Sequence, residues 1–131
     1  MILLDTHALL WLVAEPRRLS GAATAAIRAA RSAGGIGVAS ITLWEMAVLF
    51  ARGYVRARGT VDAAIGQVVD AAHVSVREIT PVIAALAAQF PDDFPRDPAD
   101  RLIAATARAE GLPLVTRDER IRASALLKTI W

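Results

Sequence analysis

Met1-Ile-Leu-Leu-Asp5-Thr6 opens the chain with an apolar run that ends in a carboxylate. Three consecutive apolar residues, Ile2–Leu4, predict a short buried strand. The next residues, Thr6–Ala14, predict a helix that ends before Pro16, because proline cannot continue the helical hydrogen-bond pattern. The same step recurs at Ile36–Ala39, a second expected strand. Two strand-to-helix steps of this kind are typical of an α/β fold.

The rest of the chain continues the alternation of strands and helices. Ser20, Ser40, Thr60 and Asp97 each precede a helical pattern as candidate N-caps, and Gly111 follows the last long one. We expect helices over residues 20–31, 40–52, 60–72, 80–90 and 97–110, a loop over 91–95, a helical turn near Arg120, and strands over 74–79, 112–115 and 127–130. This alternation predicts an α/β fold with a mainly parallel central sheet covered by helices on both faces, in a single domain over residues 1–131.

The composition restricts the kinds of site that the chain can build. It has no cysteine among 131 residues, which excludes disulfides, thiolate nucleophiles and thiolate-bound zinc. With two histidines, a metal site must consist mainly of oxygen ligands, which favours Mg²⁺ or Mn²⁺. Hydrophobic residues make up 55% of the chain, but charges interrupt every apolar stretch before it reaches the roughly 18 residues of a membrane-spanning helix. We expect a cytoplasmic protein that does not enter a membrane.

Acidic residues recur where the expected strands end or the expected helices begin. Asp5 and Asp118 follow strands, Glu45 lies in an early helical turn, and Asp97 and Asp100 lie at the start of another helix. Because the carboxyl ends of parallel strands form one rim, these remote acids can meet in one pocket. Crowded carboxylates either retain protons or bind a cation, and a bound cation can activate water against a phosphodiester. Each acid alone is equally explained as a helix cap or a turn residue, so the prediction rests on their joint placement.

Four segments carry these acids in a fixed order. They are Ile2-Leu-Leu-Asp-Thr-His-Ala-Leu-Leu-Trp11, Ser40-Ile-Thr-Leu-Trp-Glu45, Asp97-Pro-Ala-Asp-Arg-Leu-Ile-Ala-Ala-Thr-Ala107 and Leu112-Pro-Leu-Val-Thr-Arg-Asp118. In this order and spacing the chain resembles PIN-domain nucleases over essentially its whole length, and most closely the VapC-type toxins of toxin–antitoxin pairs. It departs from them at Pro95 and Ala99, where that branch tends to carry histidine and phenylalanine.

The resemblance implies an RNA-cleaving site that uses Mg²⁺ or Mn²⁺ and leaves a 5′-phosphate. The catalytic and metal-binding acids that it implies are Asp5, Glu45, Asp100 and Asp118, with Asp97 as a candidate fifth ligand. Neighbouring residues that we take as accessory to these acids are Thr6, Thr116, Arg101 and Arg117. The resemblance further implies a cognate antitoxin protein as partner and a homodimer.

Two other functions remain open on the sequence. Asp5 at the end of a first strand also suits the nucleophile of a phosphatase of the haloacid-dehalogenase type, but position 7, where such enzymes carry a second acid, is His7. The chain could instead be a non-catalytic module that binds a partner, with acids that only cap helices. Binding of Mn²⁺ would distinguish that module from both enzymes.

The aromatic and basic residues outside the four acidic segments give weaker signals. The run 9–13 is apolar around the whole helix, which predicts burial on all sides or at an interface. Trp11 and Trp44 are expected as core or interface anchors rather than platforms for stacked bases. His7 is explained by packing or by contact with phosphate. Loop arginines, Arg18 among them, are candidates for unspecific contact with RNA.

Overall fold

Five strands form one sheet in the computed structural model, which describes residues 1–131. The bounds are β1 Ile2–Leu4, β2 Ile36–Ala39, β3 Val74–Arg77, β4 Leu114–Val115 and β5 Thr129–Ile130, in the spatial order β3-β2-β1-β4-β5. Every pairing is parallel, and Leu4 of β1 lies opposite Val38 of β2 and Val115 of β4. The parallel sheet expected from the sequence is therefore confirmed.

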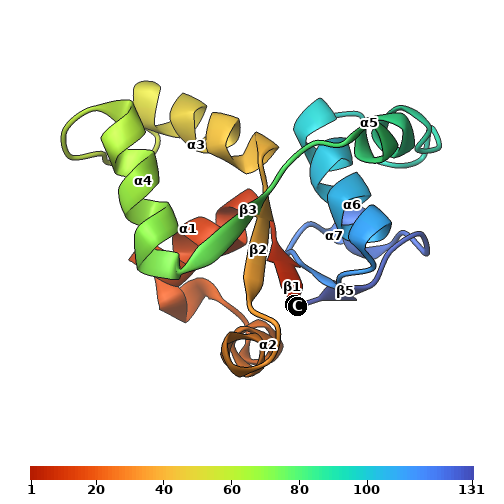
Figure 1. Ribbon diagram of the computed structural model, residues 1–131, viewed down its shortest axis with the longest axis horizontal. Coiled ribbons are helices and arrows are strands. Elements are labelled where there is room, and N and C mark those ends of the chain that lie inside the picture. Colours follow the sequence, from red (N-terminus) through yellow and green to blue (C-terminus); the bar gives the residue numbers. More distant parts are fainter.

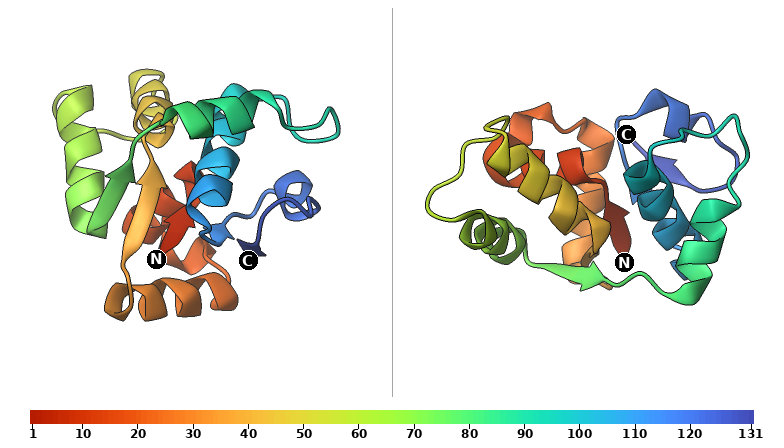
Figure 2. Two further views of the ribbon diagram at one scale, coloured as in Figure 1. Left: turned by 45° about the vertical axis from the view of Figure 1, so that its right-hand side comes forward. Right: turned by 90° about the horizontal axis from the view of Figure 1, so that it is seen from above.

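Helices cover both faces of this sheet. Their bounds are α1 Thr6–Ala14, η1 Pro16–Arg18 (a 3-10 turn), α2 Gly21–Ser32, α3 Ile41–Ala51, α4 Val61–Ala72, α5 Pro81–Ala88, α6 Pro98–Glu110 and α7 Glu119–Arg122. The helices α1 to α4 lie on one side of the sheet, and α5, α6 and α7 lie on the other (Figures 1 and 2). The α/β architecture with both faces covered is thus confirmed. None of these helices has the length and apolar character required to cross a bilayer.

The central strand β1 contributes to two separate hydrophobic cores. Successive side chains of a strand point to opposite faces of the sheet. Ile2 and Leu4 accordingly join a core of 16 buried residues with the α1–α4 side, whereas Leu3 joins a core of 12 buried residues with the α5–α7 side. A strand buried on both faces has to be apolar throughout, which is why the uninterrupted run in the sequence was informative.

The order of the strands places a crevice at the carboxyl ends of β1 and β4. The chain passes from β1 to β2 and β3 on one side, then crosses back to β4 and β5 on the other side of β1. In open parallel sheets, ligands bind where the strand order reverses in this way. Asp5 follows β1 directly, and its backbone N–H donates to the Val115 carbonyl oxygen at 3.1 Å, which ties the two strand ends together.

The helix caps agree with the sequence except at one position. Ser20, Thr60, Thr80 and Asp97 each accept a hydrogen bond from a backbone N–H of the first helical turn. The expected Ser40 cap is wrong, because Ser40 already has helical backbone angles and its side chain makes no capping bond. Its backbone N–H instead donates to the Arg77 carbonyl oxygen at 2.8 Å, which joins the start of α3 to the end of β3.

The first helix is buried within the domain rather than at an interface. The buried residues of α1 are Thr6, Ala8, Leu9, Leu10 and Trp11, and Leu9 and Leu10 pack in the core with residues of α2, α3 and α4. Val13, near its end, is 36% exposed. Packing against the sheet, α3 and α4 therefore accounts for the apolar residues in the first half of this helix.

Candidate active site

Carboxylates from four parts of the chain line one open pocket of about 730 Å³ at the carboxyl ends of β1 and β4. Six acids line it: the five singled out in the sequence, which are Asp5, Glu45, Asp97, Asp100 and Asp118, and in addition Glu119 of α7. The five come from the end of β1, from α3, from the start of α6 and from the turn after β4. The fold thus brings together all the acids that the sequence singled out.

Asp5 uses one carboxylate oxygen to cap α1. Its Oδ1 accepts from the Ala8 N–H at 2.7 Å, and its extended backbone is that of an N-cap. Burial raises the pKa of Asp5 above its ordinary value, and the nearby Thr116 hydroxyl and the bond from Ala8 offset this only in part. Asp5 is therefore both a helix cap and a desolvated acid in the pocket.

Glu45 is oriented by a pair of buried threonines. The Thr6 hydroxyl donates to Glu45 Oε1 at 2.6 Å, and the Thr6 and Thr42 hydroxyl oxygens lie 3.1 Å apart. Burial raises the pKa of Glu45, the bond from Thr6 lowers it, and the charges of Asp97 and Asp5 raise it further. The sequence did not single out Thr42, although its position three residues before Glu45 places both side chains on one face of α3.

The start of α6 contributes two acids with different surroundings. Asp97 is the N-cap, and its Oδ1 accepts from the Ala99 N–H at 2.8 Å, which leaves its second oxygen for the pocket. Asp100 lies in the first turn, where burial, followed by the charges of Asp97, Glu45 and Asp118, raises its pKa to about 7. Only the charge of Arg120 acts in the opposite direction. The pocket therefore holds more negative charge than its own cations balance.

Asp118 is held by α7 and by Thr116. Its Oδ1 accepts from the backbone N–H groups of Arg120 at 2.9 Å and Ile121 at 3.2 Å, and Arg120 Nη2 lies 3.6 Å from Oδ2. Thr116 Oγ1, which is fully buried, accepts from the Asp118 N–H at 3.1 Å. The Thr116 hydroxyl also lowers the pKa of Asp5, so it lies near both acids, and the bond from the Asp5 N–H to the Val115 carbonyl oxygen joins the two strand ends that carry them.

The donor set suits a hard divalent cation that keeps part of its water. No group of three or more His, Asp or Glu side chains is already arranged as the ligand set of one ion. Mg²⁺, however, is usually bound through one or two carboxylates together with several waters, rather than by a complete protein cage. Oxygen ligands with raised pKa values and few neighbouring cations are the donors that such an ion favours. The residues present therefore fit hydrated Mg²⁺ or Mn²⁺.

Arg101 does not face this pocket, although the sequence places it beside Asp100. Its guanidinium donates to the carbonyl oxygens of Pro95 at 2.9 Å, Phe90 at 3.0 Å and Pro91 at 3.1 Å. These contacts do not support the role accessory to the acids that the sequence suggested for Arg101. It fixes the loop that leads into Asp97. Arg117, by contrast, does line the pocket.

Replacing Arg101 with alanine should destabilise the fold by about 2 to 3 kcal/mol, because hydrogen bonds to a charged group contribute roughly 1.5–3 kcal/mol and several carbonyl groups lose their donor together. Urea unfolding would measure the change. The matched control, Arg108→Ala, removes an exposed arginine of the same helix and should cost no more than about 1 kcal/mol. Equal effects of the two substitutions would contradict this role of Arg101.

Several pocket residues were missed or assigned differently from the sequence. Trp11, expected in the core or at an interface, is 9% exposed and its remaining surface lines the pocket. Arg18 and Arg120, which come from short helical turns, line it as well, and so does His7. Trp44 is 60% exposed and is therefore not a core residue. His7 and Arg18 had been candidates for contact with phosphate or RNA, whereas Arg120 was missed because only the three-dimensional approach of α7 brings it to the acids.

The chain resembles known proteins over almost its whole length. The PIN domain family model matches residues 2–126. "Ribonuclease VapC22" of Mycobacterium tuberculosis is 43% identical over 132 aligned residues, which cover 99% of this chain and 98% of that protein.

Solved structures with a similar fold include toxin–antitoxin complexes. VapBC2 from Rickettsia felis, bound to a DNA fragment from its promoter, gives a TM-score of 0.73 at 15% identity, with 98% of this chain and 97% of that chain covered. DNA-bound VapBC from Salmonella typhimurium gives 0.69 at 19% identity, with the same coverage. These likenesses establish the fold, and the family model together with the 43% identical relative establishes that the chain belongs to the PIN domain family.

Proposed function

We propose that this chain is a metal-dependent endoribonuclease that acts as the toxin of a bacterial toxin–antitoxin pair. The observation that carries the proposal is the convergence of five acids from four remote segments on one open pocket. The 43% identity to a ribonuclease, over nearly the full length of both chains, supports RNA as the substrate. Such an enzyme would act in the cytoplasm, where its RNA substrates are.

Asp5, Asp100 and Asp118 would hold Mg²⁺ or Mn²⁺, with Glu45 and Asp97 as further ligands, directly or through water. When bound, the ion would acidify a water molecule and neutralise charge on the departing oxygen of the phosphodiester. The need for a cation follows from the electrostatics of the site, since burial and mutual repulsion raise the pKa values of Asp5, Glu45 and Asp100.

The protein's own contribution is to hold these carboxylates in place before the substrate arrives. Thr6 fixes one oxygen of Glu45, and Thr116 accepts from the Asp118 N–H. Asp5, Asp97 and Asp118 each use one oxygen to cap a helix, which restricts the direction of the other oxygen. Groups held in this way need little reorganisation during the reaction, which is where most of the catalytic advantage of such sites arises.

The decisive experiment is to incubate the purified chain with total RNA and Mg²⁺ or Mn²⁺ and to map the ends of the fragments. We expect cleavage that stops in EDTA, resumes when excess metal is restored, and leaves 5′-phosphate ends. Cleavage that survives EDTA would count against the site, because without a metal ion the five clustered carboxylates would repel each other and the phosphate of the substrate. A 2′,3′-cyclic phosphate product would also contradict the proposal, since it implies attack by the neighbouring ribose hydroxyl instead of water.

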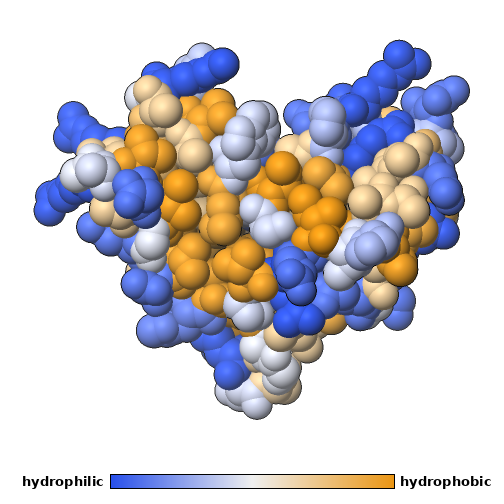
Figure 3. All heavy atoms as spheres, turned by 45° about the horizontal axis from the view of Figure 1, so that its top comes forward, coloured by the Kyte–Doolittle hydropathy of each residue, from blue (hydrophilic) through white to orange (hydrophobic).

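We also propose two protein partners. The structural neighbours named above are VapBC complexes, and the excess negative charge of the pocket suits an antitoxin that inserts a basic side chain among the acids. The second proposed partner is another copy of this chain. Exposed apolar side chains on α3, on β3, on α5 and on the segment between β3 and α5 support a homodimer. These residues are Trp44, Val76, Ile79 and Val82. In Figure 3, apolar atoms gather over the notch between the α3–α4 and α5–α6 sides. The molar mass of the pure chain in solution tests the dimer.

The two alternative functions have less support. The phosphatase would need an acid two residues after Asp5, but His7 occupies that position and lies exposed at the lip of the pocket. A non-catalytic module needs acids only as helix caps, yet Asp100 caps no helix and is half-buried among other acids. Membership of the PIN domain family argues against both.

A further inference from the structure

Two arginine side chains lie against one tryptophan at the edge of the acidic pocket. The Arg18 guanidinium carbon lies 4.5 Å from the centroid of the Trp11 ring, and that of Arg117 lies 5.9 Å from the same ring. Arg18 ends the short turn η1, and Arg117 lies between β4 and α7, so segments about a hundred residues apart in sequence supply the pair. The same tryptophan ring therefore adjoins guanidinium groups from two remote segments of the chain.

Trp11 is a fixed support for these cations. It is 9% exposed and lies on the buried helix α1. Its ring contacts His7 and Trp131, each with ring centroids 5.8 Å away, in tilted arrangements. A cation over an aromatic face is attracted by the negative charge of that face, so the ring restricts where each guanidinium can lie. Trp11 therefore holds Arg18 and Arg117 in place, although neither side chain is buried.

The two arginines keep most of their bonding capacity for a ligand. Arg117 takes part in none of the salt bridges of the molecule. Arg18 has only a long contact with Glu15, at 3.8 Å, between two partly exposed side chains. Arg120, at the same pocket, differs because its guanidinium already lies near Asp118. Arg18, with this one long contact, and Arg117, with no salt bridge, thus form a basic edge on a pocket whose interior is acidic.

We propose that Arg18 and Arg117, held by Trp11, bind one backbone phosphate of the RNA next to the phosphate that is cleaved. This inference rests on the ribonuclease function proposed above. The planar guanidinium matches the oxygens of a phosphate, and the pocket residues Arg18, Trp11 and Arg117 border the same cavity as the acids. A stacked base is the less suitable ligand, because Trp11 is nearly buried and guanidinium groups already lie against it.

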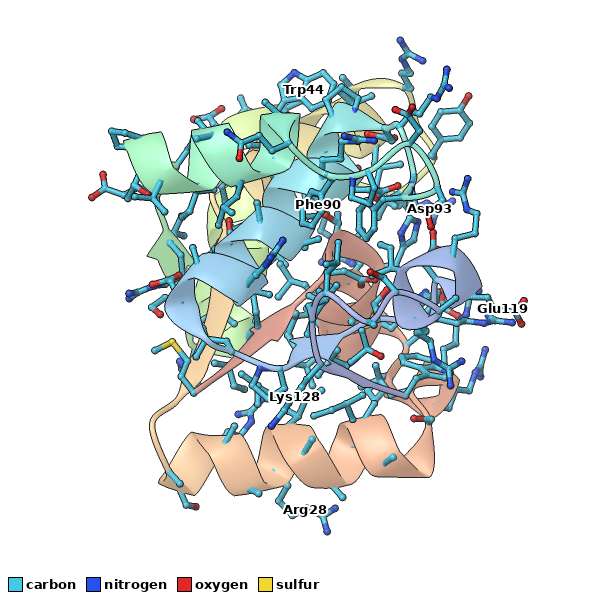
Figure 4. All side chains as sticks on the ribbon, turned by 90° about the vertical axis from the view of Figure 1, so that its right-hand side faces the viewer. Arg28, Trp44, Phe90, Asp93, Glu119 and Lys128 are labelled. Carbon is cyan, nitrogen blue, oxygen red and sulfur yellow. The ribbon has the colours of Figure 1, made fainter.

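This role predicts weaker binding rather than a lost chemical step. In a protein made inactive by Asp5→Asn, the double substitution of Arg18 and Arg117 by alanine should weaken the binding of a single-stranded oligoribonucleotide about tenfold or more. It should also lower the salt dependence of log K by about 0.7 for the phosphate contact that is lost. Arg28→Ala is the matched control, because Arg28 projects from α2, well away from Glu119 on the pocket wall (Figure 4), and it should change neither value.

A chemically modified substrate can locate the phosphate. Once the cleavage site has been mapped, each neighbouring linkage is replaced in turn by an uncharged methylphosphonate. One position should weaken binding to the Asp5→Asn protein about tenfold, and the same position should have no effect when Arg18 and Arg117 are also alanine, because a contact that is already lost cannot be lost twice. Replacement of both by lysine, which keeps the charge but not the planar fork, should give intermediate binding.

The outcomes separate this proposal from the ribonuclease function. If the unaltered chain shows no metal-dependent cleavage, the proposed function fails. If it cleaves RNA but the Arg18 and Arg117 variants bind and cleave as it does, or if every methylphosphonate position affects both proteins equally, only the phosphate site is overturned. The rise in melting temperature caused by Mn²⁺ should be the same in the arginine variants and in the unaltered chain, which would exclude damage to the acidic pocket as the cause of weaker binding.

Discussion

Replacing Asp5 with asparagine is expected to reduce metal-dependent RNA cleavage at least about 100-fold, and the protein should remain fully folded. Even residues that only orient metal ligands typically contribute 10–100-fold to affinity or activity, so the loss of a ligand itself should cost more. Asp5 is the most buried acid of the pocket and follows the central strand.

The fold should survive this change because asparagine caps a helix as well as aspartate does. The amide oxygen can still accept from the Ala8 N–H. The substitution also removes a buried charge, since burial raises the pKa of Asp5 and an ionised carboxylate there opposes folding at neutral pH. The melting temperature without metal should therefore equal or exceed that of the unaltered chain.

A matched control separates the site from acidity in general. Asp70→Asn changes an exposed acid of α4 and should leave cleavage, metal binding and stability unaltered. Kinetics of both variants, measured beside the melting curves, test the prediction. Near-normal cleavage by the Asp5 variant would disprove the proposed site, and an unfolded variant would disprove the account of the Asp5 cap.

The sequence predicted the strands and helices that depend on local patterns. The strands β1 and β2 were placed to the residue, because each is a continuous apolar run with a clear boundary. β3 was expected to reach residue 79 but ends at Arg77, which pairs with Ala39, the last residue of β2. The last strand, expected over 127–130, is limited to Thr129–Ile130 (β5) because its partner β4 has only two residues with which to pair. Strand ends depend on the neighbouring strand, which no local pattern reveals.

The site, too, could be predicted from the sequence only in part. The rule that parallel strands end at one rim was sufficient to bring the five acids together from the sequence alone. It was insufficient for Arg101, because adjacent residues on a helix point in directions about 100° apart, and Arg101 accordingly faces the loop while Asp100 faces the pocket. The contact between Trp11 and two arginines depends on the tertiary approach of three segments and had no signal in the sequence.

Asp100 should make the metal-free protein more stable as the pH falls from about 8 to about 6. Its pKa in the folded state is raised to about 7, from an ordinary value of 3.8. In this range the folded state takes up a proton that the unfolded state does not yet bind, so folding is favoured by acid and the gain is lost as the pH rises through the folded pKa. Burial raises the pKa values of Asp5 and Glu45 in the same direction.

A bound divalent ion should reverse this dependence, because it stabilises the ionised carboxylates and competes with the proton. At a concentration 100 times its dissociation constant, an ion that binds only the folded state adds about 2.7 kcal/mol, and this gain should be larger at about pH 8 than at about pH 6. Asp100→Asn should weaken both effects: its melting temperature should vary less with pH in EDTA and rise less with Mn²⁺ than that of the unaltered chain. Melting curves of the two proteins at several pH values, with and without Mn²⁺, measure this directly. If Asp100→Asn and the unaltered chain respond alike, the Asp100 carboxylate neither interacts with the other acids nor binds the ion. The proposed metal site would then lose the acid whose pKa is raised most clearly by burial and by neighbouring negative charges.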